Sequence, residues 1–151
     1  MFSLFDHEVN NFIDEHRRAV IATVDRDGQP YTSNIYYALS KNNQIFFVTK
    51  EQTTKAKNLL ENDRAALTIS DNEKPIAVNL TGTARRLEDY KERDTIMQQI
   101  FKVSYEKHKD YAPIVKMHKG SFSVFQFHPI QAKMTDFSKP MGEVKEKLKD
   151  Y

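Results

Sequence analysis

A run of hydroxyl and amine side chains lies where a short helix is expected to begin. Thr53 and Thr54 stand at the start of a predicted helix over Thr53–Asn62, and Lys55 follows them. A helix N-terminus presents unpaired N–H groups and the positive end of the helix dipole, and both attract an anion. The two hydroxyls and the Lys55 ammonium add to that attraction, and Lys50 is near in sequence. The pattern predicts a phosphate site, and it fits equally a threonine that only caps the helix beside solvated lysines.

Other reactive groupings are missing from the sequence. There is no cysteine, which excludes disulfides, thiolate nucleophiles and cysteine-ligated metal or iron–sulfur centres. The five histidines are scattered, and none has the His-x-x-x-His or His-Glu-x-x-His spacing of a metal site. No serine lies in a Gly-x-Ser-x-Gly elbow. We therefore expect no metal ion, and the sequence identifies no catalytic residue.

The composition is typical of one small globular domain, spanning 1–151, with a core over about 5–137 and a tail over 138–151. The 23 basic and 21 acidic residues are well mixed apart from a lysine-rich tail, unlike the concentrated basic face of a nucleic-acid binder. No apolar run approaches the roughly 20 residues of a membrane span, and the N-terminus lacks a signal-peptide pattern. We expect a cytoplasmic protein that binds neither nucleic acid nor membranes.

Short apolar or alternating segments predict a sheet around the candidate phosphate site. The expected strands are Arg18–Val24, Tyr31–Ala38, Gln44–Thr49, Ala65–Ser70, Ile76–Leu87, Ser121–Phe127 and Ile130–Phe137. The last two are expected to be joined by a turn at His128 and Pro129. Helices are expected over Phe5–His16, over Thr53–Asn62, after an Asp89–Glu92 capping box, around Pro113–His118 and in the tail after Pro140.

The order and linkage of these elements favour one fold class. Most neighbouring strands are linked by short turns, such as Asp25–Gly28, which suits antiparallel hairpins. The sequence therefore predicts a mainly β protein with some helix, in which an antiparallel sheet closes as a barrel with helices at its ends.

Four segments follow one another in a recognisable order: the hairpin Ala22–Pro30, the strand–loop–helix Phe47–Leu59, the start of a strand at Asn62–Leu67 and the Gly-x-Ala of Gly82–Ala84. In the same order they resemble motifs of the pyridoxamine 5'-phosphate oxidase superfamily of FMN-binding proteins. The resemblance covers about Arg18–Leu87 well and is weaker through Phe122–Phe137. It implies a Greek-key split barrel of six to seven antiparallel strands, flanked by helices.

The resemblance also implies a cofactor site and an assembly. In relatives, FMN lies in a groove between the subunits of a homodimer, and a strand equivalent to Tyr31–Ala38 runs along the edge of the flavin ring. The residues that it assigns to the cofactor are Ser33, Asn34, Val48, Thr49, Lys50, Thr53, Thr54 and Lys55.

The sequence departs from the family pattern at three places. Ser33 or Asn34 stands where relatives often carry an arginine that binds the phosphate, and Ala77 stands where the oxidases carry a glutamine from the neighbouring subunit. The arginine- and histidine-containing segment that holds pyridoxal phosphate is missing from Thr135–Glu143. The resemblance thus implies a relative that is not a true pyridoxamine 5'-phosphate oxidase.

Three functions remain open at this point. The first is an FMN-dependent oxidoreductase that acts on an unidentified small molecule. The second is a non-catalytic protein of the same fold that binds or stores flavin, the deazaflavin F420 or haem. The third is a dimeric structural protein without a cofactor. The missing arginine favours the second and third.

Overall fold

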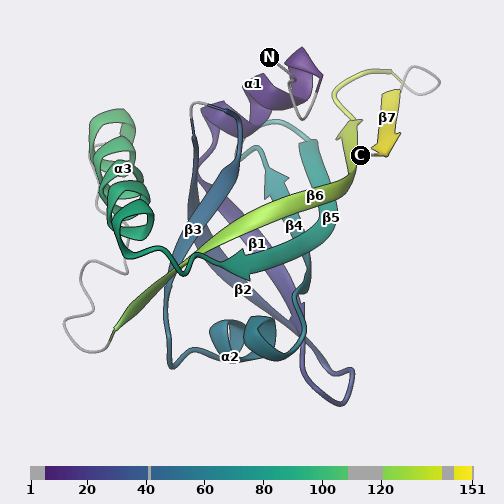
Figure 1. Cartoon of the computed structure of the whole chain (residues 1–151). Helices are drawn as coiled ribbons and strands as arrows, with labels where there is room; N and C mark the ends of the chain where they lie inside the picture. The colour runs from purple at the N-terminus through teal and green to yellow at the C-terminus, as the bar shows by residue number, and fades with distance from the viewer. Residues whose placement is uncertain (1–5, 41, 109–120, 141–144, 151) are drawn as a thin grey trace.

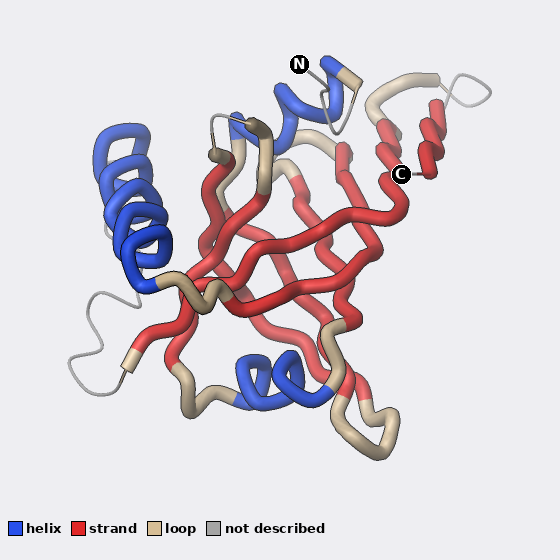
Figure 2. The backbone as a smooth tube through the Cα atoms, in the orientation of Figure 1, coloured by secondary structure: helices blue, strands red, loops and turns tan. Residues whose placement is uncertain are grey.

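The computed structural model describes residues 6–40, 42–108, 121–140 and 145–150. Helices and groups of two or three consecutive strands follow one another along them, as Figures 1 and 2 show. The helices are α1 (His7–Glu15), α2 (Thr54–Glu61) and α3 (Tyr90–His108). The strands are β1 (Arg18–Val24), β2 (Pro30–Leu39), β3 (Ile45–Lys50), β4 (Arg64–Ser70), β5 (Ile76–Arg86), β6 (Phe122–Asp136) and β7 (Lys145–Asp150).

All strand pairings are antiparallel, and one of them closes the sheet. The strands follow the order β3-β2-β1-β4-β5-β6-β7, and β3 pairs with β6 as well as with β2. This extra pairing makes a closed barrel of six strands, with β7 as an extension beside β6 (Figure 2). The predicted split barrel of six to seven strands is confirmed.

The barrel interior is filled by side chains from alternate strand positions. Phe47 and Phe125 stack with ring centroids 5.5 Å apart, and Phe127 lies beside them in the same cluster. At one end α1 inserts Phe12 and Ile13 into the interior, and at the other end α2 covers the opening (Figure 1). Burial of these apolar surfaces is the main stabilising contribution to the fold.

The third helix covers one outer side of the barrel. A second buried cluster joins Phe46 and Val48 of β3 to Ile100 of α3. Because neighbouring residues of a strand face opposite sides, Phe46 and Val48 pack under α3, whereas Ile45 and Phe47 fill the barrel. Burial on both faces explains the unbroken apolar run of this strand.

The prediction of two strands joined at His128 and Pro129 is wrong, because β6 runs unbroken through both residues. Its pairing with β5 shifts between Thr81 and Gly82, so that Pro129 lies opposite Gly82 and Ile130 is left over as a bulge. A proline has no N–H group to donate to the ladder, and it is tolerated at a bulge because the ladder is interrupted there. The dipeptide therefore bends a long strand here instead of ending it.

Two further expectations in the C-terminal third need correction. The stretch after Pro140 was expected to be helical, but its described part, Lys145–Asp150, is the strand β7. The segment 104–119 was expected to be a loop with a short helix, but α3 continues through His108. The helix expected around Pro113–His118 lies outside the described residues.

Gly82 marks the closest approach between β5 and β6. A Cβ atom placed there would lie 2.0 Å from the backbone oxygen of His128. We predict that Gly82→Ala destabilises the protein by about 2–3 kcal/mol, because the clash is with backbone that cannot swing away. Gly28 is the matched control, since its φ of +85° strains an alanine but no atom lies within 4 Å of the added Cβ. Urea denaturation should give Gly28→Ala a smaller cost of about 1 kcal/mol, and the reverse order would contradict the clash.

The end of α1 is fastened to the turn between β4 and β5. His16 Nδ1 lies 2.7 Å from the carbonyl oxygen of Phe12, and its Nε2 lies 3.2 Å from Oδ2 of Asp71. The other oxygen of Asp71 accepts hydrogen bonds from the backbone N–H groups of Glu73 and Lys74, each at 2.7 Å. These backbone bonds, and then the contact with His16, hold the pKa of Asp71 below its ordinary value.

A carboxyl whose pKa is lowered by folding stabilises the fold above its ordinary pKa of about 4, and that contribution is lost as the pH falls through the lower folded value. Asp71→Asn should therefore lower the melting temperature at pH 7, and the difference from the unmodified protein should shrink as the pH falls below about 4. Asp27→Asn in the β1–β2 hairpin is the control, because none of the described hydrogen bonds reaches its carboxylate. The same pH-dependent difference in that variant would contradict the role of Asp71.

Candidate functional site

The barrel opens beside β2, where the strand loses one of its two partners. β2 pairs with β3 only over Tyr37–Leu39, whereas its pairing with β1 extends from Tyr36 back to Pro30. Tyr37 N donates to Arg17 O on the β1 side at 2.9 Å, and hydrogen bonding alternates along an antiparallel pair. The backbone groups of Asn34 and Tyr36 therefore point away from β1, toward the opening. Among the described strands, none pairs with this edge.

The loop from β3 to α2 lies at the end of the same opening and is held by two threonines. The Thr53 hydroxyl donates to the carbonyl oxygen of Lys50 at 2.8 Å and accepts from Ala56 N at 3.3 Å, so it is the N-cap of α2. Thr49 Oγ1 lies 3.0 Å from Thr53 Oγ1. Because the Thr53 proton is used on Lys50 O, Thr49 is the donor in this contact. The capping role left open by the sequence thus belongs to Thr53.

None of the described hydrogen bonds uses the Thr54 hydroxyl or the Lys55 ammonium as a donor. The Thr54 side chain is exposed, and Lys55 is partly buried on the next position of the helix. Within the described part of the chain, no hydrogen bond engages the backbone N–H groups of these two residues, as is normal in the first turn of a helix. Burial lowers the pKa of Lys55 from its ordinary value, since a desolvated ammonium is less stable. An anion bound here would offset that cost.

The remaining residues assigned to the cofactor do not all meet at this loop. Ser33 has the inward strand parity of Thr49, whereas Asn34 points outward. The Val48 side chain packs under α3. Lys50 is 9% exposed, and its Nζ lies 5.7 Å from the ring centroid of Phe122. Because Lys50 follows Thr49 directly along β3, its side chain lies on the opposite side of the strand. The structure thus brings Thr49, Thr53, Thr54 and Lys55 together and directs the side chains of Val48 and Lys50 elsewhere.

The site offers donors for an anion and a strand edge, but no other reactive grouping. Over the described ranges, no group of three or more histidine, aspartate or glutamate side chains could hold a metal ion. Glu51, in the loop before α2, is an acid whose Oε1 accepts from the Ser123 hydroxyl at 3.3 Å. The arrangement suits a phosphorylated ligand with a flat polar edge, bound by Thr54, Lys55 and the backbone of β2.

The sequence was also compared with models of known protein families. The family model described as pyridoxamine 5'-phosphate oxidase matches residues 5–136, which is most of the chain. The chain belongs to this family. No curated protein matches the sequence.

Solved structures of other family members and of related barrels share the fold. A pyridoxamine 5'-phosphate oxidase-related, FMN-binding protein from Nostoc punctiforme is 13% identical, with a TM-score of 0.64, and the match covers 94% of this chain and 91% of that one. A heme-binding protein from Mycobacterium smegmatis is 19% identical, with a TM-score of 0.66, over 93% and 56% of the two chains. ChuZ of Campylobacter jejuni is 14% identical, with a TM-score of 0.74, over 97% and 60%. This chain thus spans little more than half of the last two proteins, and at these identities the likeness concerns the fold.

The family resemblance already places the strand Tyr31–Ala38 along a flavin, but the residue types alone reveal neither the open edge of β2 nor the arginines Arg17 and Arg18 around the start of β1. The edge has no signature in residue types, because it consists of backbone groups and depends on where β3 diverges. Arg17 and Arg18 had a signal, since Arg17 precedes β1 and Arg18 begins it, and the partner strand carries Asn34 and Tyr36 at outward positions. The register between β1 and β2 was needed to bring them together. No helix among the described residues is long and apolar enough to cross a bilayer.

Proposed function

We propose that this family member binds FMN and acts as a flavin-dependent oxidoreductase on a small molecule. The observation that carries the proposal is the open edge of β2 beside the free N-terminal turn of α2. The backbone groups of the β2 edge suit the polar edge of a flavin ring, and the N-terminal turn of α2 suits a phosphate. The similar fold of the FMN-binding protein from Nostoc punctiforme supports the same cofactor.

The chain's own groups would divide the cofactor between them. The Lys55 ammonium, the Thr54 hydroxyl and the N–H groups of the first turn of α2 would hold the phosphate. The backbone N–H groups of Asn34 and Tyr36 would donate to acceptors on the ring. When bound, FMN supplies a ring that accepts and releases electrons, and the protein supplies binding, orientation and exclusion of water.

Ser33 or Asn34, both neutral, stands where relatives often place an arginine on the phosphate. A hydrogen bond to a charged group contributes about 1.5–3 kcal/mol. We therefore expect FMN affinity roughly 10- to 100-fold lower than in a relative that keeps the arginine. Lys55 then carries most of the positive charge at the phosphate, which makes it the decisive residue for a test.

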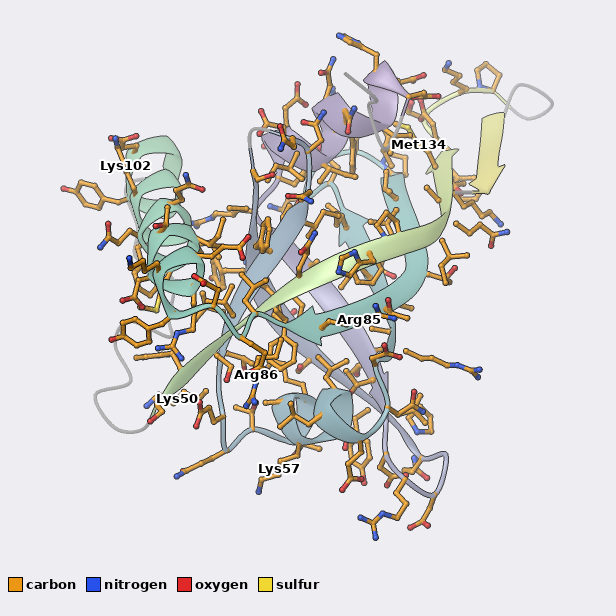
Figure 3. The ribbon with its side chains drawn as sticks, in the orientation of Figure 1. Lys50, Lys57, Arg85, Arg86, Lys102 and Met134 are labelled. Carbon is orange, nitrogen blue, oxygen red and sulfur yellow. The ribbon has the colours of Figure 1, made fainter. Side chains whose placement is uncertain are left out.

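Lys55→Gln should weaken FMN binding about 10- to 100-fold, and Thr54→Ala should weaken it about threefold to tenfold, because one charged and one neutral hydrogen bond are lost. Quenching of FMN fluorescence in a titration measures both. Lys57→Gln is the matched control, because Lys57 is two residues further along the helix and points away from the strands (Figure 3). Equal losses in Lys55→Gln and Lys57→Gln, or no loss in either, would contradict the phosphate site.

The same titrations carry a second readout. Only the protonated Lys55 amine holds a phosphate well, and burial places its pKa below the ordinary value of about 10.4. FMN affinity should therefore fall as the pH rises through that lowered pKa. Lys55→Gln should lose this dependence, since glutamine does not titrate.

We further propose that the protein is a homodimer that pairs through the outer face of β1, β4 and β5. Ala22, Ala66 and Thr81 lie in register across the three strands on this face. They line a hollow of ≈ 510 Å³, together with Val24 and the half-exposed bulge residue Ile130. Small and apolar side chains let two such faces approach closely, and an isologous dimer needs only one self-complementary patch.

Ala66→Arg should convert the dimer to a monomer, because a long charged side chain would stand at the centre of the contact. Light scattering coupled to size exclusion measures the mass directly. Thr95→Arg places the same charge on an exposed position of α3 and should leave the dimer intact. A monomeric unmodified protein at tens of micromolar (roughly the range where weak dimers still form) would contradict the proposal.

A second candidate is a binding protein of the same fold without turnover, holding flavin, the deazaflavin F420 or haem. Ser33 and Asn34 favour it, because a missing phosphate arginine suits a different or a loosely bound ligand. The related fold of the heme-binding protein from Mycobacterium smegmatis makes haem the other cofactor to try. Steady reduction of an acceptor by NAD(P)H with FMN present supports the oxidoreductase, and a haem absorption band without flavin binding supports the alternative.

A further inference from the structure

A second cavity lies on the outer face of the barrel and takes no part in the phosphate site. It is a groove of ≈ 560 Å³ between the last turn of α1 and the strands β1, β2 and β4. Its floor is set by register, since Val20 lies between Asn34 of β2 and Thr68 of β4. One step further along, Arg18 pairs with Tyr36. All of these side chains have outward parity, so the groove belongs to the barrel surface and not to its core.

The side chains that line the groove carry more positive than negative charge, and several of them are hydrogen-bond donors. Arg17 and Arg18 both line it, and Glu15 is the only carboxylate among its lining residues. The Arg17 guanidinium carbon lies 5.4 Å from the ring centroid of Tyr36, which places a flat cation against an aromatic ring. Arg18 Nη2 lies 3.4 Å from Oδ1 of Asn72, so its planar end is directed to the rim.

The wall of the groove is fixed by the contact that fastens α1. His16 lines the groove, and both of its ring nitrogens are engaged, one by the Phe12 carbonyl and the other by Asp71. The bond to Phe12 occupies one of the carbonyls at the negative end of the helix, which would otherwise repel an anion. The arginines therefore face a wall that is already ordered before any ligand arrives.

We propose that this groove binds the anionic group of the substrate, a carboxylate or a phosphate monoester on a small organic molecule. The assignment rests on the proposed flavin function, because the groove shares Asn34 and Tyr36 with the open edge of β2. A molecule anchored by Arg17 and Arg18 would extend along β2 toward the flavin ring. Guanidinium groups suit both anions, since their planar donors match two oxygens at once.

The test uses the FMN-loaded protein and three probes, namely benzoate, phenyl phosphate and inorganic phosphate. Calorimetry measures binding, and the flavin absorption spectrum reports whether the probe lies near the ring. Arg18→Gln should weaken binding of the preferred probe about tenfold, the effect of losing one charged hydrogen bond. Asn72→Asp, an exposed change that adds negative charge at the rim, should weaken it as well without disturbing the core.

Arg26→Gln is the matched control. Arg26 is an exposed arginine of the β1–β2 hairpin whose Nη2 lies 3.0 Å from Glu61 Oε1, and the hairpin lies at the α2 end of the barrel. Its loss removes the same charge from the protein as a whole but not from the groove. Equal weakening by Arg18→Gln and Arg26→Gln would overturn the proposal, because it would mean diffuse attraction. Failure of all three probes to bind at millimolar concentration (roughly the weak limit for small anions) would overturn it too.

The outcomes separate the two proposals. FMN binding without any probe binding removes the groove and leaves the flavin function standing. Probe binding that depends on Arg18 in a protein that takes no FMN keeps an anion site but removes its role as the substrate site of a flavin enzyme. Preference for benzoate over phenyl phosphate assigns a carboxylate, and the opposite preference assigns a phosphate ester.

Discussion

The pairing of β3 with two different strands determines most of this molecule. Along its whole length β3 bonds to β6, which closes the barrel, but it stays with β2 for only three residue pairs. Beyond Phe47, β3 keeps its pairing with β6 while its pairing with β2 ends. That divergence exposes the backbone of Asn34 and Tyr36, and it delivers the chain to the start of α2, where Thr53 caps the helix. The same strand therefore closes the barrel through β6 and, where it leaves β2, opens the candidate cofactor site.

The sequence predicted the barrel well because its strands have clear signals. Ala65–Ser70 alternates because only its inner face is buried in the barrel. The apolar run before Thr49 is unbroken because one face of that strand fills the barrel and the other packs under α3. His128 and Pro129 misled the prediction because local turn chemistry was outweighed by pairing with β5, where Gly82 admits the bulge. The strand β7 was predicted as a helix for a similar reason. It forms through pairing with β6, and nothing in the composition of the tail indicates that pairing.

The candidate site was predicted only in part, and the boundary follows strand geometry. Thr49, Thr53, Thr54 and Lys55 could be found because a helix start has a recognisable pattern of hydroxyl residues. Lys50 shares the same stretch of sequence, but a one-residue step along a strand reverses the side chain, and its amine lies over Phe122 instead. The family resemblance assigns neighbours along the chain to a cofactor, but only the strand register separates side chains on the side of the candidate site from those that pack under α3.

The open edge of β2 also bears on how this protein behaves in concentrated solution. A strand edge with free backbone groups is a template on which another chain can add its own strand, and proteins usually protect such edges. Here Pro30 at the start of β2 lacks an N–H group, and the exposed Thr32 and Asn34 make the edge polar. A ligand lying along it would complete the protection. Without such a ligand, the open edge would favour self-association of the folded protein, and light scattering of stored samples would detect that association before any unfolding.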